Sequence, residues 1–223
     1  MKKAVITMTV LLVAAISLEL GLRLVANPNL EYYRRIKLLH SFHPEYYVGL
    51  MPGMEQTITH YNKTWSGTFR INSLGYRGPQ VDRHRPHLAC VGDSLVMGFG
   101  VSDHETFCHH LNNLEHGGHT LQAVNLGVDA FGTVGNYQRL KEATAHLNLK
   151  TALYFVSPND FTLPETLKAQ GILPDDEVSV LRDKDPSFRK LFHLQFEVTR
   201  ISYLLNVLVL SLEQLKIRTL LTR

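Results

Sequence analysis

The stretch His-Leu-Ala-Cys-Val-Gly-Asp-Ser, residues 87–94, decides the fold that we expect for this chain. Residues 87–91 form a short, mostly apolar run of the kind that makes a buried strand, and Gly92 ends it. Apolar runs at residues 121–125 and 151–156 follow, so strand ends recur at intervals of about 30 residues, the length of one strand-helix-strand unit. This repeat predicts an α/β domain with a parallel sheet.

Helical patterns lie between the expected strands. A first helix is predicted from a cap at Ser102 or Asp103 to a stop at the Gly117-Gly118 pair. Its apolar face would carry Phe107, Leu111 and Leu114. A second amphipathic helix is predicted from a face made by Tyr137, Leu140, Ala143 and Leu147. The α/β domain would therefore occupy residues 86–223.

Two further segments flank this repeat. Residues 26–85 are rich in proline and glycine, so we expect a turn-rich, extended lead-in with short strands near residues 55–58 and 67–71. After a polar loop beyond Phe161, Asp185-Pro186 predicts the start of a long helix. Its apolar stretch, residues 201–212, is too short to cross a membrane. It is therefore expected to be a core helix, or a helix whose packing partner is absent from this chain.

Residues 1–25 have the pattern of an export signal. Lys2 and Lys3 precede a long uncharged and largely apolar run, and the first later charge is Glu19. Counted through Leu22, this run approaches the ~20 residues that span a bilayer. Because no small-x-small cleavage site follows, we favour an uncleaved signal anchor over a cleaved signal peptide. The domain is then expected on the extracytoplasmic side of a membrane, the periplasmic side in a bacterium.

Composition argues against several other classes of protein. The chain is 44% hydrophobic and 19% charged, which is typical of globular proteins, and its net charge of +3 without a dense Lys/Arg run argues against a nucleic-acid partner. Cys90 and Cys108 lack the spacing of a zinc site or a redox pair, so we expect two small buried residues. No metal and no cofactor are expected, since the spacing of the clustered histidines matches no ligand set. These are His104, His109, His110, His116 and His119.

Ser94 is the candidate nucleophile. A serine hydroxyl attacks a carbonyl only if a base removes its proton and fixed donors stabilise the oxyanion. At the start of a helix that follows a strand, Ser94 would be exposed and close to backbone N–H groups. Asp93 and Ser94 also favour simple helix capping, and Val96 replaces the second glycine of the Gly-x-Ser-x-Gly elbow. The triplet by itself leaves catalysis and capping open.

Three blocks at the predicted strand ends, read together, resemble the SGNH (GDSL-type) hydrolases. They are Gly-Asp-Ser-Leu-Val-Met-Gly (92–98), Asn-Leu-Gly-Val-Asp-Ala-Phe-Gly-Thr (125–133) and Ser-Pro-Asn-Asp-Phe (157–161). Residues 69–78 also resemble the lead-in of membrane-anchored members, some of which accompany cell-surface polysaccharide synthesis. The resemblance covers roughly residues 65–161 and implies a three-layer, flavodoxin-like α/β fold with a parallel sheet.

The same resemblance implies the roles of individual residues. Ser94 would be the nucleophile, and its backbone N–H would form the oxyanion hole with the Ala130 N–H and the Asn159 side-chain amide. Ala130 stands where the family has a glycine. The family's catalytic Asp-x-x-His block occurs nowhere in this chain. His193, the one histidine after Asn159, lies in an apolar helical pattern and is expected to be structural or at the surface.

These features imply a membrane-anchored esterase, or an O-acyl or O-acetyl ester hydrolase or transferase, whose domain lacks the final catalytic block. Its substrate would be a small acyl ester, with O-acylated glycans included by family analogy. The alternative is a catalytically inactive relative that binds a glycan or an assembly partner in the same cleft. A third interpretation supplies the histidine from a partner chain or a later segment.

Overall fold

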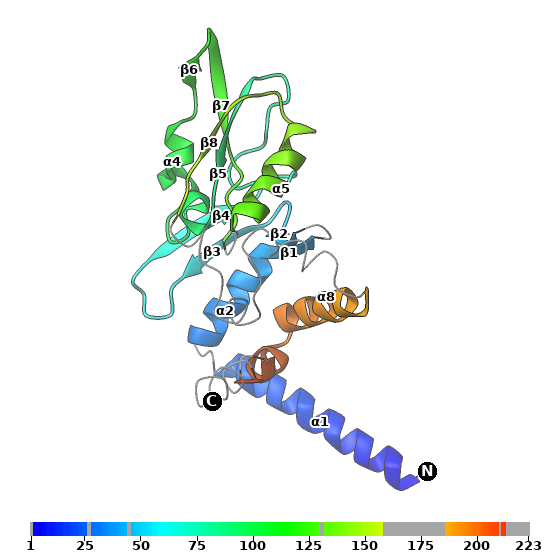
Figure 1. The fold of residues 1–223 in the computed structure, drawn as a ribbon. Coiled ribbons are helices and arrows are strands. Elements are labelled where there is room, and N and C mark those ends of the chain that lie inside the picture. Colours follow the sequence, from blue (N-terminus) through cyan, green and yellow to red (C-terminus); the bar gives the residue numbers. More distant parts are fainter. Residues whose placement is uncertain are drawn as a thin grey trace, which may run out of the picture.

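The computed structural model describes residues 2–25, 28–43, 46–129, 132–157, 186–209 and 211–212. The fold is mixed α/β, and its centre is a four-stranded sheet in the order β6-β7-β5-β8 (Figure 1). The strands are β5 (His87–Val91), β6 (Leu114–His116), β7 (His119–Asn125) and β8 (Leu149–Tyr154). β5 pairs in parallel with both β7 and β8, which confirms the three predicted strands. The sheet as a whole is mixed, because β6 pairs antiparallel with β7.

The helix predicted between residues 102 and 116 is wrong beyond its first turns. A 3₁₀ turn η1 (Asp103–Glu105) and a short helix α4 (Phe107–His110) form, but Leu114 belongs to β6. The chain leaves the helix at Asn113, whose φ of 64° lies in the left-handed region that asparagine tolerates. Gly117 and Gly118, with φ of 57° and 76°, form the tight turn of the β6–β7 hairpin and do not end a helix.

Side chains cover both faces of the central strand. On one face, Ala89 and Val91 pack with Ala143 of helix α5 (Thr133–Thr144) and with Leu147, which follows that helix. On the other face, Leu88 and Cys90 pack with Cys108 of α4. Tyr137 on α5 is 60% exposed, so its predicted place on the apolar face is wrong. β5 is therefore a fully buried strand.

The lead-in contains more regular structure than its turn residues indicate. It begins with helix α2 (Pro28–Leu39), because Pro28 occupies the first helical position, where a missing N–H costs nothing. Two antiparallel hairpins follow, β1 (His40–His43) with β2 (Tyr47–Leu50), and β3 (Glu55–Thr59) with β4 (Ser66–Arg70). The second hairpin confirms the predicted short strands. Leu39, Phe69 and Val128 share one core cluster, which joins the lead-in to the α/β domain.

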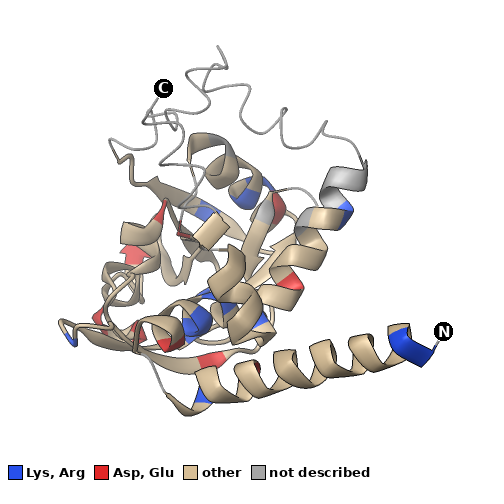
Figure 2. Ribbon diagram, turned by 90° about the horizontal axis from the view of Figure 1, so that it is seen from below, with Lys and Arg blue, Asp and Glu red and all other residues tan. Residues whose placement is uncertain are grey.

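Two helices lie at the base of the domain. Helix α1 (Lys2–Leu24) extends from it with no buried residue, and it is the one helix in the described ranges that is long and apolar enough to cross a membrane. At ~1.5 Å per residue it spans about 35 Å, against ~30 Å for a bilayer core. Figure 2 shows it uncharged between the lysines at one end and the charged residues near the other. Helix α8 (Pro186–Ile201) begins at Pro186 as predicted, while Asp185 and the predicted loop beyond Phe161 lie outside the described residues.

Candidate functional site at the carboxyl ends of the strands

The nucleophile candidate lies at a tight turn from strand to helix. β5 ends at Val91, and the short helix α3 (Ser94–Met97) begins three residues later. A Cβ on Gly92 would overlap Val96 Cγ2 and lie 3.0 Å from the Phe155 carbonyl oxygen. Only glycine therefore permits this close passage of the backbone between α3 and the segment after β8.

Asp93 caps α3. Its buried carboxylate accepts a hydrogen bond from the Leu95 N–H at 2.9 Å. Ser94 is half-buried, and neither its Oγ nor its backbone N–H bonds to any residue that the structure describes. Asp93 is therefore the cap of α3, and among the described residues the Ser94 hydroxyl and N–H have no partner.

The loop after β7 is fixed directly against α3. Asn125 Nδ2 donates to the Val96 carbonyl oxygen at 2.8 Å, and Asn125 Oδ1 accepts from the Gly127 N–H at 2.9 Å. A Cβ on Gly127 would overlap the Met97 backbone nitrogen, so this residue must be glycine. These contacts hold the backbone of the second sequence block against helix α3. Ala130, the predicted oxyanion donor of this block, lies outside the described residues.

The end of β8 also meets the end of β5. Phe155 donates its backbone N–H to the Val91 carbonyl oxygen at 2.9 Å. The structure thus brings together the ends of all three parallel strands, as the sequence predicted. Asn159 lies outside the described residues, so its role as an oxyanion donor stays a prediction.

Arg77 holds the far end of α3, a role that sequence analysis missed. Its buried guanidinium donates to the carbonyl oxygens of Met97 (2.6 Å), Gly98 (2.7 Å) and Val101 (2.6 Å), and to the Asp103 carboxylate at 2.8 Å. Burial lowers the pKa of Arg77 from its ordinary value, and the Asp103 carboxylate opposes that shift. Arg77 is part of the lead-in motif of residues 69–78, but its neighbours in the sequence do not show which carbonyl groups it binds.

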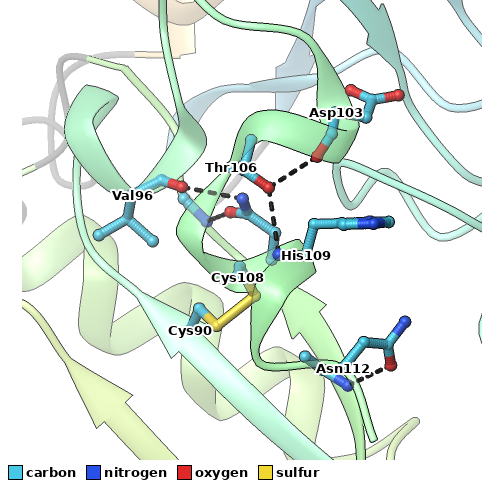
Figure 3. Close-up of a disulfide and its surroundings, with 10 residues drawn as sticks. Cys90, Val96, Asp103, Thr106, Cys108, His109 and Asn112 are labelled. Carbon is cyan, nitrogen blue, oxygen red and sulfur yellow. Dashed lines mark hydrogen bonds between the residues drawn. A yellow bond between two sulfur atoms is a disulfide. The ribbon is translucent and has the colours of Figure 1, made fainter.

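The two cysteines form a disulfide, which the sequence analysis did not predict. Cys90 on β5 is bonded to Cys108 on α4, with 6.1 Å between their Cα atoms (Figure 3). Both are buried, as expected. The separation of 18 residues matches no motif, and only the packing of α4 on the sheet brings the sulfur atoms together.

No histidine of the described residues is hydrogen-bonded to Ser94. His193 lies on α8, half-exposed, with its ring stacked on Phe42 of β1 at 4.4 Å between centroids. The five clustered histidines after β5 are all exposed. His193 therefore has the structural contact that its sequence context predicted.

Buried His40 pairs with Asp129 of the second block, and sequence analysis missed this contact. His40 Nε2 bonds to Asp129, and its Nδ1 bonds to the Ile36 carbonyl oxygen at 2.7 Å. Burial alone would lower the pKa of His40, but the Asp129 carboxylate and the Ile36 carbonyl raise it above its ordinary value. With both ring nitrogens engaged, His40 ties the loop after β7 to the lead-in.

No family model matches this chain, and no curated protein matches its sequence. Its function must therefore be argued from the side chains themselves. The larger described cavity, about 450 Å³, lies where α1, α2 and β3 meet and is lined by Arg23, Tyr32, Arg35 and Lys63, among others. It does not include Ser94.

Proposed function

We propose that this chain is a membrane-anchored SGNH-type serine hydrolase with Ser94 as its nucleophile. The proposal rests on the hydrogen bonding at Ser94, which lies in a fixed strand-to-helix turn. Asp93 satisfies the helix cap, so the Ser94 hydroxyl and backbone N–H remain unengaged among the described residues. A free hydroxyl beside a free donor is the arrangement that acyl transfer to serine requires.

The chemistry follows from this arrangement. Ser94 Oγ would form a bond to the carbonyl carbon of an acyl ester, and the alcohol would leave with the serine proton. The Ser94 N–H would stabilise the oxyanion, together with the Ala130 N–H and the Asn159 amide. Water or a sugar hydroxyl would then attack the acyl-enzyme and release Ser94. Small acyl esters, including O-acetyl groups on glycans, fit this reaction, and it needs no cofactor.

The disulfide supports an extracytoplasmic site for this chemistry. Structural disulfides persist in oxidising compartments and are rare in the cytosol. The Cys90–Cys108 bond lies inside the domain, and Cys90 is two residues before Gly92. An anchor formed by α1, with Lys2 and Lys3 on the cytoplasmic side, would deliver the domain to such a compartment.

A second candidate is a binding protein without turnover. Both ring nitrogens of His40 are engaged, and His193 is stacked on Phe42 away from α3, so neither is free to take the Ser94 proton. Without its base a serine nucleophile loses several orders of magnitude in rate. The same strand-end site would then hold an acylated glycan or an assembly partner.

A fluorophosphonate probe on the full chain in detergent separates these candidates. We expect labelling that Ser94→Ala abolishes and that Ser73→Ala retains, since Ser73 is an exposed serine whose Oγ bonds to Gln80. Ester hydrolysis should be lost in Ser94→Ala and kept in His193→Ala. Absence of labelling in a folded protein would exclude the serine hydrolase. Retention of the chain on an O-acetylated glycan, lost in Leu95→Asp beside Ser94, would then support the binding protein.

A further inference from the structure

The C-terminal helices expose a continuous apolar stripe. α8 is followed by a second helical stretch at residues 203–209, and hydrogen bonds from Ser202 N to Val198 O (3.0 Å) and from Asn206 N to Ser202 O (3.1 Å) join the two. Six aliphatic side chains along this length are 38–63% exposed: Leu191, Leu194, Ile201, Leu205, Leu208 and Leu212. Leu191, Leu194 and Ile201 lie in α8, and the other three lie in the stretch after Ser202. Within each set, the spacing in steps of three, four or seven residues places the side chains on one helical face.

The opposite face of these helices already has a packing partner. The Tyr203 hydroxyl bonds to Glu31 and accepts from Arg34 Nε at 3.0 Å, both on α2. Lys37 Nζ donates to Asn206 Oδ1 at 2.7 Å. Tyr203 and Asn206 are buried. The exposed stripe therefore lies on the side opposite these contacts, and no described residue of the domain covers it.

Specific contacts place this stripe beside the end of α1. The Glu19 carboxylate accepts hydrogen bonds from Ser202 Oγ (2.9 Å) and from the Tyr203 N–H (3.1 Å). Arg23 donates to the Ile201 carbonyl oxygen at 2.9 Å. Glu19 and Arg23 belong to the last two turns of α1, where that helix meets the domain (Figure 1). The start of the second helical stretch thus lies at the level where α1 would leave a bilayer.

The residues around this junction are those that favour a membrane–water interface. Tyr33 and Tyr61 are 42% and 43% exposed. Arg23, Arg35 and Lys63 line the neighbouring cavity. Tyrosines gather at the headgroup level of membranes, and long basic side chains extend toward it.

We propose that the stripe from Leu191 to Leu212 lies in the interfacial layer of the same bilayer that α1 crosses. The proposal rests on the proposed anchoring by α1. A bilayer is favoured over a second copy of the chain because the stripe lies beside the exposed apolar surface of α1, where Glu19 bonds to Ser202 and Tyr203 and Arg23 bonds to Ile201. Amphipathic helices of this kind bury their apolar face about 5–10 Å into the headgroup boundary. Two membrane contacts then fix the orientation of the domain, and with it the height of Ser94 above the lipid.

Depth-dependent fluorescence quenching in phosphatidylcholine vesicles tests this proposal on the full chain. Trp65, the single native tryptophan, is replaced by phenylalanine, and one tryptophan is introduced at a time. Leu194→Trp and Leu205→Trp report on the stripe, and Leu11→Trp reports on α1. Glu115→Trp, in the exposed β6 strand, is the matched control. With brominated acyl chains we expect about twofold quenching at the three apolar positions, whose indoles would lie ~5 Å or more inside the lipid, and none at position 115.

The outcomes separate this proposal from the proposed anchoring. Quenching at position 11 without quenching at 194 and 205 overturns the interfacial stripe and leaves the anchor intact. Absence of quenching at position 11 overturns the anchor itself. If emission at 194 and 205 is unaffected by bromine but changes with the protein-to-lipid ratio, the stripe binds a second copy, and the bilayer assignment is wrong.

Discussion

Strands β5 and β8 have similar sequences and very different surroundings. Both are short apolar runs that predict buried strands, yet every residue of β5 is buried, whereas most of β8 is exposed, including Leu153 at 36% and Tyr154 at 41%. β5 lies between two parallel neighbours, and β8 is the edge strand of the described sheet. An apolar run therefore determines that a strand forms, while the elements packed beside that strand determine how much of it is buried.

The largest loss of stability is expected at the end of β5, where the Arg77 guanidinium binds the carbonyl groups that follow α3. Arg77→Leu removes one member of a buried ion pair and leaves Asp103 uncompensated, so we expect a loss of about 3–5 kcal/mol in the free energy of unfolding. Glu55→Gln is the control, because its pair with Arg70 is exposed and contributes about 1 kcal/mol or less. Urea unfolding followed by Trp65 fluorescence measures both. Equal losses would contradict the role given to Arg77.

Replacing one leucine by alanine in each strand tests directly how differently β5 and β8 are buried. Leu88→Ala in β5 should cost about 2–5 kcal/mol, because Leu88 is fully buried and a cavity would remain. Leu153→Ala in β8 should cost below about 1 kcal/mol, since much of that side chain already contacts solvent. The same urea titration measures both. A large loss for Leu153 would show that β8 is covered in solution.

A disulfide joins β5 to α4, whereas β8 has no such covalent link among the described residues. Replacing both Cys90 and Cys108 by alanine opens a loop of 18 residues, and we expect a loss of about 3 kcal/mol. The native chain should react with a maleimide only after reduction. Labelling of the native protein without a reductant would show that the bond is absent.

The smallest effect is expected at the His40–Asp129 pair, which ties down the loop after β7, the other neighbour of β5. The pKa of His40 is raised in the folded protein, so the pair contributes stability that is fully present below the unfolded value of about 6.5 and is lost as pH rises through the folded pKa. His40→Gln should therefore cost about 1.5 kcal/mol near pH 6 and less at pH 9. Asp129→Asn should show the same pH dependence of urea stability. A cost that is independent of pH would exclude the charged pair.

Local patterns were sufficient for the parallel strands, the apolar α1 and the turn at Ser94. Strand periodicity, glycine at a close approach and an uncharged run of bilayer length are all properties of neighbouring residues. The same reasoning failed where one residue type serves two structures. Pro28 was interpreted as a turn residue and begins α2, and Gly117-Gly118 was interpreted as a helix stop and turns a hairpin.

The tertiary structure alone decided the remaining features. The Cys90–Cys108 bond, the Arg77 clamp and the His40–Asp129 pair join residues that are 18 to 89 positions apart, and no local pattern encodes such partners. The exposure of β8 likewise depends on which strands lie beside it. The sequence by itself determined the three parallel strands and the place where Ser94 turns out of β5. Packing determined that Asp93 caps α3 and that the Ser94 hydroxyl has no partner in the part of the chain that the structure describes, because a hydrogen bond forms only where folding brings donor and acceptor together.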